Sequence, residues 1–269
     1  GFDRSARALA PLLEKHLGVA IAIKNNPGAG GRKGTILLYK SKADGYTIGW
    51  SQYVAFQVDV HLMGQTAPID ISKFEVIQQA NSSSHYLYVG KKSPFSSVEA
   101  MKKASRPVKF TATGVGSTSW IKALAFSSAM GFKVDFITGY KSLTTAALAV
   151  AKGDGEAGIG SSGHLKGVAN EVKPIVWLGS SRTAKHPDVP TIKELGHPKL
   201  TALDAMRVVV APPGTPKSVL AVLRAAMKKA TAEPEYLAFA KKSSLSVNPL
   251  GPDGVRESLK VMTEILGSM

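Results

Sequence analysis

The chain has 269 residues, carries a formal net charge of +15 and contains no cysteine. The length permits one large domain or two smaller ones, and the missing thiols exclude disulfides, thiolate metal sites and cysteine nucleophiles. Basic residues come in scattered pairs such as Lys91-Lys92 and Lys228-Lys229, without interleaved aromatics. This pattern argues against a nucleic-acid-binding stripe and leaves a solvated basic surface, or long-range attraction of acidic small molecules.

The first part of the chain alternates between predicted helices and strands. Asp3 is expected to cap a first helix that Gly18 ends, and the glycine-rich turn Asn25–Gly34 leads into a second. Such alternation favours a parallel α/β sheet. Helices are predicted over 4–17, from the turn to about 40 and over 98–103, and strands over 19–24, 46–50, 74–79 and 86–89.

A second alternation follows and then a helical tail. Thr215 and Pro216 are the expected N-cap and first residue of one tail helix. Two such blocks predict two lobes, the first comprising 1–95 and 204–269 and the second 96–203. Strands are predicted over 108–113, 134–137, 157–159, 172–178 and 208–211, and helices over 120–130, 143–151, 191–195, 217–230, 235–242 and 253–266, with another starting at 160–163.

Several predicted strands end in loops of Gly, Ser and Thr that open directly into helices. Ligands of open α/β sheets bind outside the carboxyl ends of the strands, where free helix N–H groups favour an oxygen-rich anion. Ordinary turn chemistry is the alternative for any single loop. The recurring pattern predicts a small carboxylate ligand that undergoes no reaction. The loops are Pro27–Gly31, Ser51-Gln52, Gly114–Ser119, Thr138–Ser142 and Gly160–Gly163.

A dinucleotide-dependent oxidoreductase is the main alternative. Gly114-x-Gly116-x-x-Ser119 follows a predicted strand, and Asp135 lies further on, as in a dinucleotide fingerprint. Ser119 replaces the third glycine, and only His164 and Lys141 are plausible acid–base residues near this loop. The six histidines show no metal-ligand spacing, so no metal and no cofactor are expected. An effector-sensing module is a third possibility, although no helix-turn-helix is apparent.

Segments spread along the chain resemble a known family. Asn25–Gly31 followed by Asp44-Gly45-Tyr46-Thr47 is similar to the N-R-P-G-A-G-G…D-G-Y-T signature of the solute receptors of tripartite tricarboxylate transporters, the Bug type. Pro187–Thr191 resembles the P-D-V-P-T segment of this family, and Ala211–Pro216 its A-P-x-G-T-P segment. Gly1-Phe2-Asp3 resembles the end of its first loop.

This resemblance implies a periplasmic binding protein type II-like fold, in which two α/β lobes surround a central cleft. It implies a monomeric, non-enzymatic receptor that captures a dicarboxylate, tricarboxylate, amino acid or aromatic acid and delivers it to a membrane permease. The expected location is the bacterial periplasm, and the chain shows no signal peptide, which we expect to have been removed.

The site residues follow from the loops together with the resemblance. Arg207 stands where the family often has aromatic residues, and we expect it to cap its strand at the surface rather than to face a carboxylate. Asp204 is expected to have a polar role near the site. The expected ligand contacts are Phe2, Asp3, Pro27, Gly28, Ala29, Gly30, Ser51, Gln52, Ser117, Thr118, Ser119, Thr138, Tyr140, Lys141, Gly160, Ser161, Ser162 and Asp204.

Overall fold

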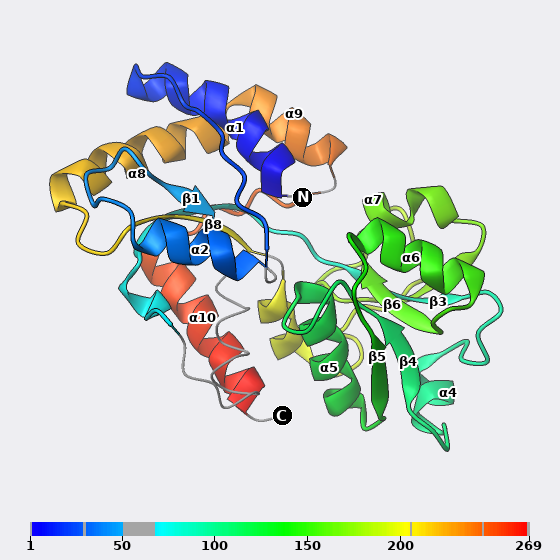
Figure 1. Ribbon diagram of the computed structural model, residues 1–269. Helices are drawn as coiled ribbons and strands as arrows, with labels where there is room; N and C mark the ends of the chain where they lie inside the picture. Colours follow the sequence, from blue (N-terminus) through cyan, green and yellow to red (C-terminus); the bar gives the residue numbers. More distant parts are fainter. Residues whose placement is uncertain (1, 29–30, 51–67, 205, 244, 268–269) are drawn as a thin grey trace. The chain divides into compact units, whose positions relative to one another are not determined.

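The chain divides into two compact units (Figure 1). The computed structural model describes residues 2–28, 31–50, 68–204, 206–243 and 245–267. Unit 1 comprises Gly1–Ser82 and Met206–Lys260, and unit 2 comprises Ser83–Ala205 and Val261–Met269. The chain thus leaves unit 1 after Ser82 rather than near residue 95. The reason is strand β3 (Tyr86–Gly90), which pairs with strands of unit 2.

Unit 1 contains a three-stranded antiparallel sheet with the order β1-β8-β2. Strand β8 (Arg207–Ala211) lies between β1 (Gly49–Trp50) and β2 (Glu75–Asn81). The expected parallel sheet is therefore wrong for this unit, because the central strand comes from the far end of the chain. Its side chains alternate between two hydrophobic clusters, with Val209 in one and Val208 and Val210 in the other. Both faces of β8 are covered, which explains the unbroken apolar run after Arg207.

Helices cover both faces of this sheet (Figure 1). One cluster joins Leu9 and Leu13 of the first helix to Leu220 and Leu223 of the helix that follows β8. The other cluster includes Leu38 and Val255. The helices are α1 (Phe2–Leu17), α2 (Arg32–Tyr39), the 3₁₀ helix η2 (Ile71–Lys73), α8 (Lys217–Ala232), α9 (Pro234–Lys242) and α10 (Pro252–Gly267), whose residues from Val261 belong to unit 2.

Four local predictions for unit 1 are wrong. Asp3 lies inside α1 rather than before it, so it does not cap this helix. Residues 19–24 form no strand. Ile21 and Ile23 are half-buried between exposed neighbours, so the alternating pattern reflects packing of one side of the segment rather than hydrogen bonding to another strand. The strand predicted from residue 46 is confined to β1, and Tyr46 is 90% exposed. Pro216, not Thr215, is the N-cap of α8, because the Thr215 hydroxyl donates to the Pro212 carbonyl at 2.8 Å.

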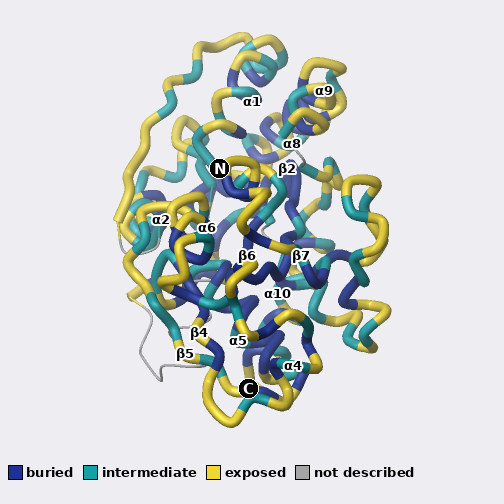
Figure 2. Tube along the Cα trace, turned by 90° about the vertical axis from the view of Figure 1, so that its right-hand side faces the viewer, coloured by how far each residue is buried: buried dark blue, intermediate teal, exposed yellow. Residues whose placement is uncertain are grey.

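Unit 2 contains a five-stranded mixed sheet with the order β5-β4-β6-β3-β7. Strand β4 (Val108–Thr111) is parallel to both β5 (Val134–Ile137) and β6 (Ala157–Gly160). Strand β3 is antiparallel to β6 and to β7 (Val172–Trp177). All four residues of β6 are buried. Figure 2 marks the buried parts of the chain in dark blue.

The two faces of the sheet in unit 2 pack against different helices. Leu87 and Val89 of β3 belong to a cluster that includes Met101 and Phe126, whereas Tyr86 and Tyr88 pack with residues of another. Thr191 starts a hydrogen-bonded turn rather than the predicted helix. The helices are α4 (Val98–Lys102), α5 (Thr118–Met130), α6 (Leu143–Lys152), α7 (Ser162–Leu165) and the 3₁₀ helices η3 (Lys166–Val168) and η4 (Pro198–Leu203).

Candidate functional site

One edge of the sheet in unit 2 collects the predicted ligand loops of that unit. Because β5, β4 and β6 are parallel neighbours, their carboxyl ends lie at the same edge, and so do the loops that follow them. Strand β3 runs the opposite way and pairs Tyr86 with Gly160. Its first residue, and His85 before it, therefore lie at this same edge. The topology brings together loops that the sequence could only suggest one at a time.

The loop after β4 uses its hydroxyl groups to start α5. The Ser117 hydroxyl caps the helix by accepting a bond from the Trp120 N–H, at 3.4 Å. It also lies 3.2 Å from the hydroxyl of Ser119, which is buried, whereas Thr118 is half-buried. This geometry leaves both serine oxygens at the N-terminus of a helix of 13 residues, where an anion is electrostatically favoured.

The loop after β5 is more open. Thr138 and Lys141 are exposed, and Tyr140 is half-buried. Burial raises the pKa of the Tyr140 phenol, and the Asp154 carboxylate raises it further. Tyr140 is therefore a neutral hydrogen-bond donor at neutral pH, and Lys141 is an exposed positive charge.

The loop after β6 is organised by a histidine. His164 Nδ1 lies 3.1 Å from the backbone nitrogen of Ser161 and 2.9 Å from its hydroxyl oxygen. The imidazole ring is nearly parallel to that of His85, with 4° between the planes and 6.3 Å between the centroids. Gly160 is buried, and Ser162 is half-buried as the first residue of α7. His164 thus connects the predicted loop to the start of β3.

A buried ion pair lies next to His85. The Lys122 side chain, only 2% exposed, donates from Nζ to Asp204 Oδ1 at 2.7 Å and contacts His85 Nδ1 at 3.2 Å. The Ser84 hydroxyl donates to the other carboxylate oxygen of Asp204. Sequence analysis singled out Asp204 but missed Lys122 and His85. The available signal was a lysine within the otherwise apolar segment Ile121–Ala125.

A buried arginine lies in unit 1 at the edge of the sheet where β8 begins and β2 ends. Arg207, the first residue of β8, is 7% exposed and pairs with Asn81, the last residue of β2. Its Nη1 donates to Asn81 Oδ1 at 3.0 Å, and its guanidinium carbon lies 5.3 Å from the ring centre of Phe2. The Phe2 ring meets Trp50 edge to face, with centroids 6.3 Å apart. The expectation of a surface position for Arg207 is wrong.

Burial also affects the charge of this arginine. It lowers the pKa of the Arg207 guanidinium, while the Tyr236 phenol opposes the change. The phenol oxygen of Tyr236 accepts a hydrogen bond from Asn81 Nδ2, so Asn81 links the two groups. A guanidinium titrates so far above neutrality that Arg207 still carries its positive charge at pH 7.

The remaining predicted residues of unit 1 lie in or near the first helix and the glycine-rich turn. Asp3 is inside the first turn of α1, where its carboxylate accepts from Asn25 Nδ2 at 2.7 Å and from Arg7 Nε at 3.0 Å. These two bonds, the first above all, lower the pKa of Asp3. Pro27 and Gly28 are exposed. Ala29, Gly30, Ser51 and Gln52 lie outside the described residues.

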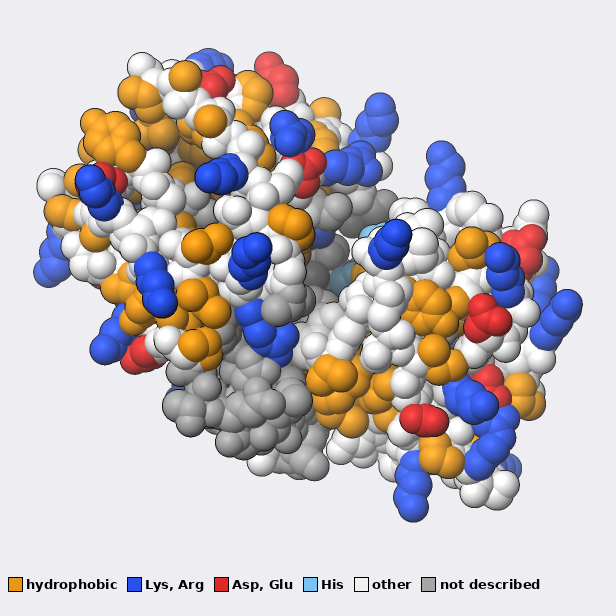
Figure 3. All heavy atoms as spheres, viewed as in Figure 1, with side chains coloured by type: hydrophobic (Ala, Val, Ile, Leu, Met, Phe, Trp, Pro, Cys, Tyr) orange, Lys and Arg blue, Asp and Glu red, His pale blue; other side chains and the backbone are white. Residues whose placement is uncertain are grey.

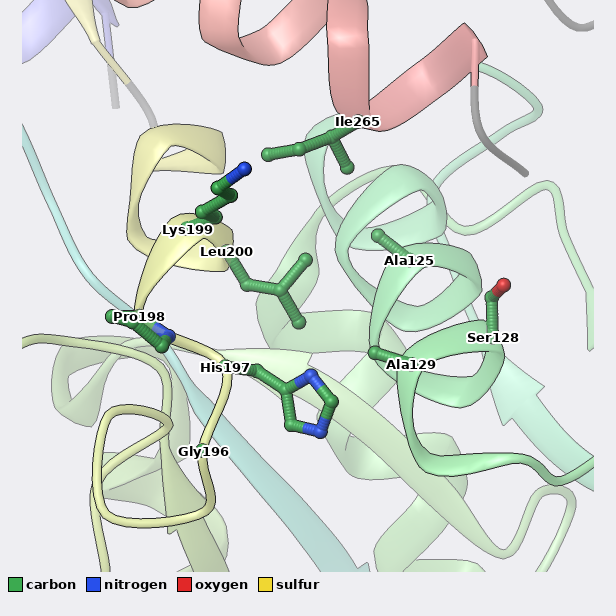
Figure 4. A pocket seen from close by; sticks show the side chains of 9 residues that line it. All are labelled: Ala125, Ser128, Ala129, Gly196, His197, Pro198, Lys199, Leu200 and Ile265. Carbon is green, nitrogen blue, oxygen red and sulfur yellow. The ribbon is translucent and has the colours of Figure 1, made fainter.

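A separate cavity of about 380 Å³ lies within unit 2 and contains no predicted ligand residue. In Figure 4, His197 and Leu200 extend towards Ala125 and Ala129 of α5, and Ile265 approaches from α10. Among the described residues, no cluster of acidic or histidine side chains is arranged to hold a metal ion. In the same part of the chain, no helix combines the length and apolar character needed to cross a membrane. Lys and Arg side chains are scattered over the face shown in Figure 3.

Comparison with known proteins identifies related sequences. The family model described as "Tripartite tricarboxylate transporter family receptor" matches residues 5–254. Protein BugT of Bordetella pertussis is 28% identical over 230 residues, which cover 82% of this chain and 69% of BugT.

Solved structures show the same fold. MatC from Rhodopseudomonas palustris, with bound malate, has a TM-score of 0.79 at 20% identity, covering 98% of this chain and 94% of MatC. Rpa4515 of R. palustris, with adipate, has a TM-score of 0.79 at 20% identity, covering 97% of this chain and 89% of Rpa4515. These likenesses confirm the predicted α/β, periplasmic binding protein type II-like fold.

Proposed function

Since the chain belongs to the receptor family of tripartite tricarboxylate transporters, we propose that it binds a small organic carboxylate and delivers it unchanged to a transporter permease. The periplasm is the proposed site of action. Members of this family are receptors rather than enzymes, so the predicted absence of catalysis is confirmed and the dinucleotide-dependent oxidoreductase is ruled out. The Gly114–Ser119 loop, which suggested that enzyme, starts helix α5.

The buried guanidinium of Arg207 carries the assignment to an anionic ligand. A buried positive charge attracts a carboxylate more strongly than it attracts a neutral solute. A guanidinium also forms paired, parallel hydrogen bonds with a carboxylate. Asn81 and the ring of Phe2 hold Arg207 at the edge where β8 begins and β2 ends. We propose that Phe2 and Arg207 both contribute to binding.

Further contacts are proposed from the loops of both units. In unit 1 these are Asp3, Pro27 and Gly28. In unit 2, hydroxyl and backbone N–H donors lie at the edge where three strands end, which suits a ligand with several oxygen atoms. Asp204 is proposed to act indirectly, because Lys122 and Ser84 occupy its carboxylate oxygens. The proposed unit 2 contacts are Ser117, Thr118, Ser119, Thr138, Tyr140, Lys141, Gly160, Ser161 and Ser162.

Dicarboxylates are the proposed ligand class. MatC was solved with malate and Rpa4515 with adipate, and both share this fold. We expect a dicarboxylate to bind more tightly than a monocarboxylate of similar size, because its second carboxylate adds charged oxygen atoms that can accept hydrogen bonds.

A thermal-shift panel tests the proposal. Malate, adipate, their amides and a set of sugars are added to the purified chain. At 100 times its Kd, a ligand stabilises the folded protein by about 2.7 kcal/mol, which raises Tm by roughly 5–10 °C. We expect such shifts with dicarboxylates and none with the amides. Shifts with sugars or amides, and none with carboxylates, would overturn the carboxylate assignment.

Substitution of Arg207 tests the observation behind it. We expect Arg207→Gln to weaken dicarboxylate binding by about 30-fold or more, because truncating one partner of a buried charge pair costs about 2 kcal/mol or more. Arg207→Lys keeps the charge but cannot form the paired hydrogen bonds of a guanidinium. Its affinity for dicarboxylates should therefore lie between those of the unaltered protein and Arg207→Gln. Arg256→Gln removes an exposed arginine of the same unit and serves as the control. Equal affinities for Arg207→Gln and the control would refute the role of Arg207.

A further inference from the structure

The cavity of unit 2 lies where α5 carries small side chains. Ala125 and Ala129 are four residues apart, so they lie on the same face of the helix and leave space beside it. Leu200 of η4 and the turn Gly196–Pro198 line the opposite side. The volume of about 380 Å³ is within the range of small-molecule sites, which is about 300–1,000 Å³.

Most of the lining is apolar. Pro198, Leu200 and Ile265 contribute carbon atoms in addition to the two alanines. Ile265 belongs to the end of α10 that is grouped with unit 2, so all of the lining residues come from this unit. An apolar cavity of about 150 Å³ can hold a benzene ring. The cavity of unit 2 therefore has room for an aromatic ring and a polar group attached to it.

Two nitrogen-bearing side chains accompany this apolar lining. In Figure 4, the Lys199 side chain extends towards Ile265, and the His197 ring extends towards Ala129. Neither the Lys199 nor the His197 side chain forms an ion pair or a hydrogen bond with another described residue. No acidic side chain is among the described residues of the lining. The ammonium and imidazole groups can therefore both donate to a carboxylate that enters the cavity.

The cavity is separate from the loops proposed to bind the dicarboxylate. Those loops include Ser117, which caps the start of α5. Ala125 comes seven residues after Thr118, the first residue of this helix, and so lies about 10 Å further along the helix axis. The described residues that line the cavity include none of the predicted ligand contacts.

We propose that this cavity is a second anion site, which binds a monocarboxylate with a compact apolar body such as an aromatic ring. The apolar body packs against Ala125, Leu200 and Ile265. The carboxylate pairs with Lys199, which is exposed at the rim, and accepts a hydrogen bond from the half-buried His197 ring. Malate fits this site poorly, because it would place polar groups against the apolar lining. The second site does not depend on the proposed dicarboxylate function.

An NMR titration with benzoate tests the proposal. The ring protons of His197 are the reporter, and their disappearance in His197→Leu assigns them. We expect benzoate to shift these signals with a Kd of about 1 mM, as is reasonable for a ligand with so few atoms. Benzamide has the same ring without the charge and should bind more weakly. Malate should not displace benzoate, because the two ligands contact different residues.

Two substitutions test the apolar lining and the rim separately. Ala129→Leu fills the cavity and should weaken benzoate binding at least about 10-fold. Lys199→Gln removes the charge and should weaken it about 2–5-fold, as expected for an exposed ion pair. Lys193→Gln replaces another exposed lysine of unit 2 and is the matched control. Because the Lys199 side chain has no described partner to lose, Lys199→Gln should fold even if Ala129→Leu does not.

Several results would overturn the second site. Unchanged His197 signals at about 10 mM benzoate would do so, and so would equal affinities for benzoate and benzamide. Equal benzoate affinities for Lys199→Gln and Lys193→Gln would refute the role of the ammonium group. His197 signals that move with protein concentration alone would show that a second copy of the chain covers this face instead. A rise in Tm with malate would support the dicarboxylate function in each of these cases.

Discussion

Removing the two partners of the Lys122–Asp204 ion pair should have unequal effects on stability. Asp204→Ala leaves the Lys122 ammonium, 2% exposed, beside the ring of His85 and without the carboxylate that balances its charge. Losing one partner of a buried ion pair typically costs about 3–5 kcal/mol. Lys122→Met leaves the Asp204 carboxylate, which is 18% exposed and still accepts a hydrogen bond from Ser84. We therefore expect this variant to lose only about 1–3 kcal/mol of unfolding free energy.

The double variant provides the sharper test. Lys122→Met combined with Asp204→Ala leaves no orphaned charge, so it should be more stable than Asp204→Ala alone. At roughly 2–4 °C per kcal/mol, Asp204→Ala should lower Tm by about 6–20 °C. Circular dichroism and the fluorescence of Trp120 and Trp177, both in unit 2, report the transition. A double variant as unstable as the sum of the two single variants would refute this reasoning.

Two further predictions concern unit 2. Burial alone would raise the pKa of Glu156, but hydrogen bonds from Arg106 and the Lys109 N–H hold it below its usual value. These bonds therefore stabilise the folded protein fully above the unfolded pKa of Glu156, and the stabilisation is lost as pH falls through the folded pKa. Glu156→Gln should therefore lower Tm at pH 7 by a few degrees and make little difference near pH 3, measured by thermal scans across pH. If the variant and the unaltered protein differed in Tm as much at pH 3 as at pH 7, this assignment would be contradicted. Gly158→Ala places a methyl group 2.4 Å from the Tyr88 hydroxyl oxygen and should cost about 1–3 kcal/mol in urea unfolding, whereas Gly167→Ala, with open space around its Cβ, should be nearly neutral. Equal midpoints for these two variants would show that the contact relaxes freely.

Local signals predicted most elements of unit 2. Strand β5 has the predicted bounds, and α5 and α6 each begin beside a serine that caps the helix. These signals lie within a few residues of the element they define, so a single sequence contains them in full. The parallel order of β4, β5 and β6 follows from the helices between them, and it places the candidate loops at one edge.

Pairings between distant segments were not predictable in the same way. The apolar run 19–24 alternates as a strand does, yet nothing local shows whether a partner strand exists. Strand β8 lies between β1 and β2, although more than a hundred residues separate it from either in the sequence. Its position makes the sheet of unit 1 antiparallel and buries Arg207, which local reasoning placed at the surface. Strand-end chemistry therefore depends on topology as well as on composition.

The charged residues at the two sheet edges show why net charge alone was a poor guide to the ligand. The chain carries 34 basic residues, and most of the scattered pairs are on exposed positions that salt screens. Two basic residues at the sheet edges are buried instead, and they have different partners. Asp204 neutralises Lys122, and Arg207 contacts Asn81 and the ring of Phe2. Because a buried charge interacts more strongly with an anion than a solvated one does, Arg207 should influence ligand choice more than the whole basic surface. Removal of several exposed lysines should accordingly slow ligand association at low salt and leave the preference for dicarboxylates unchanged.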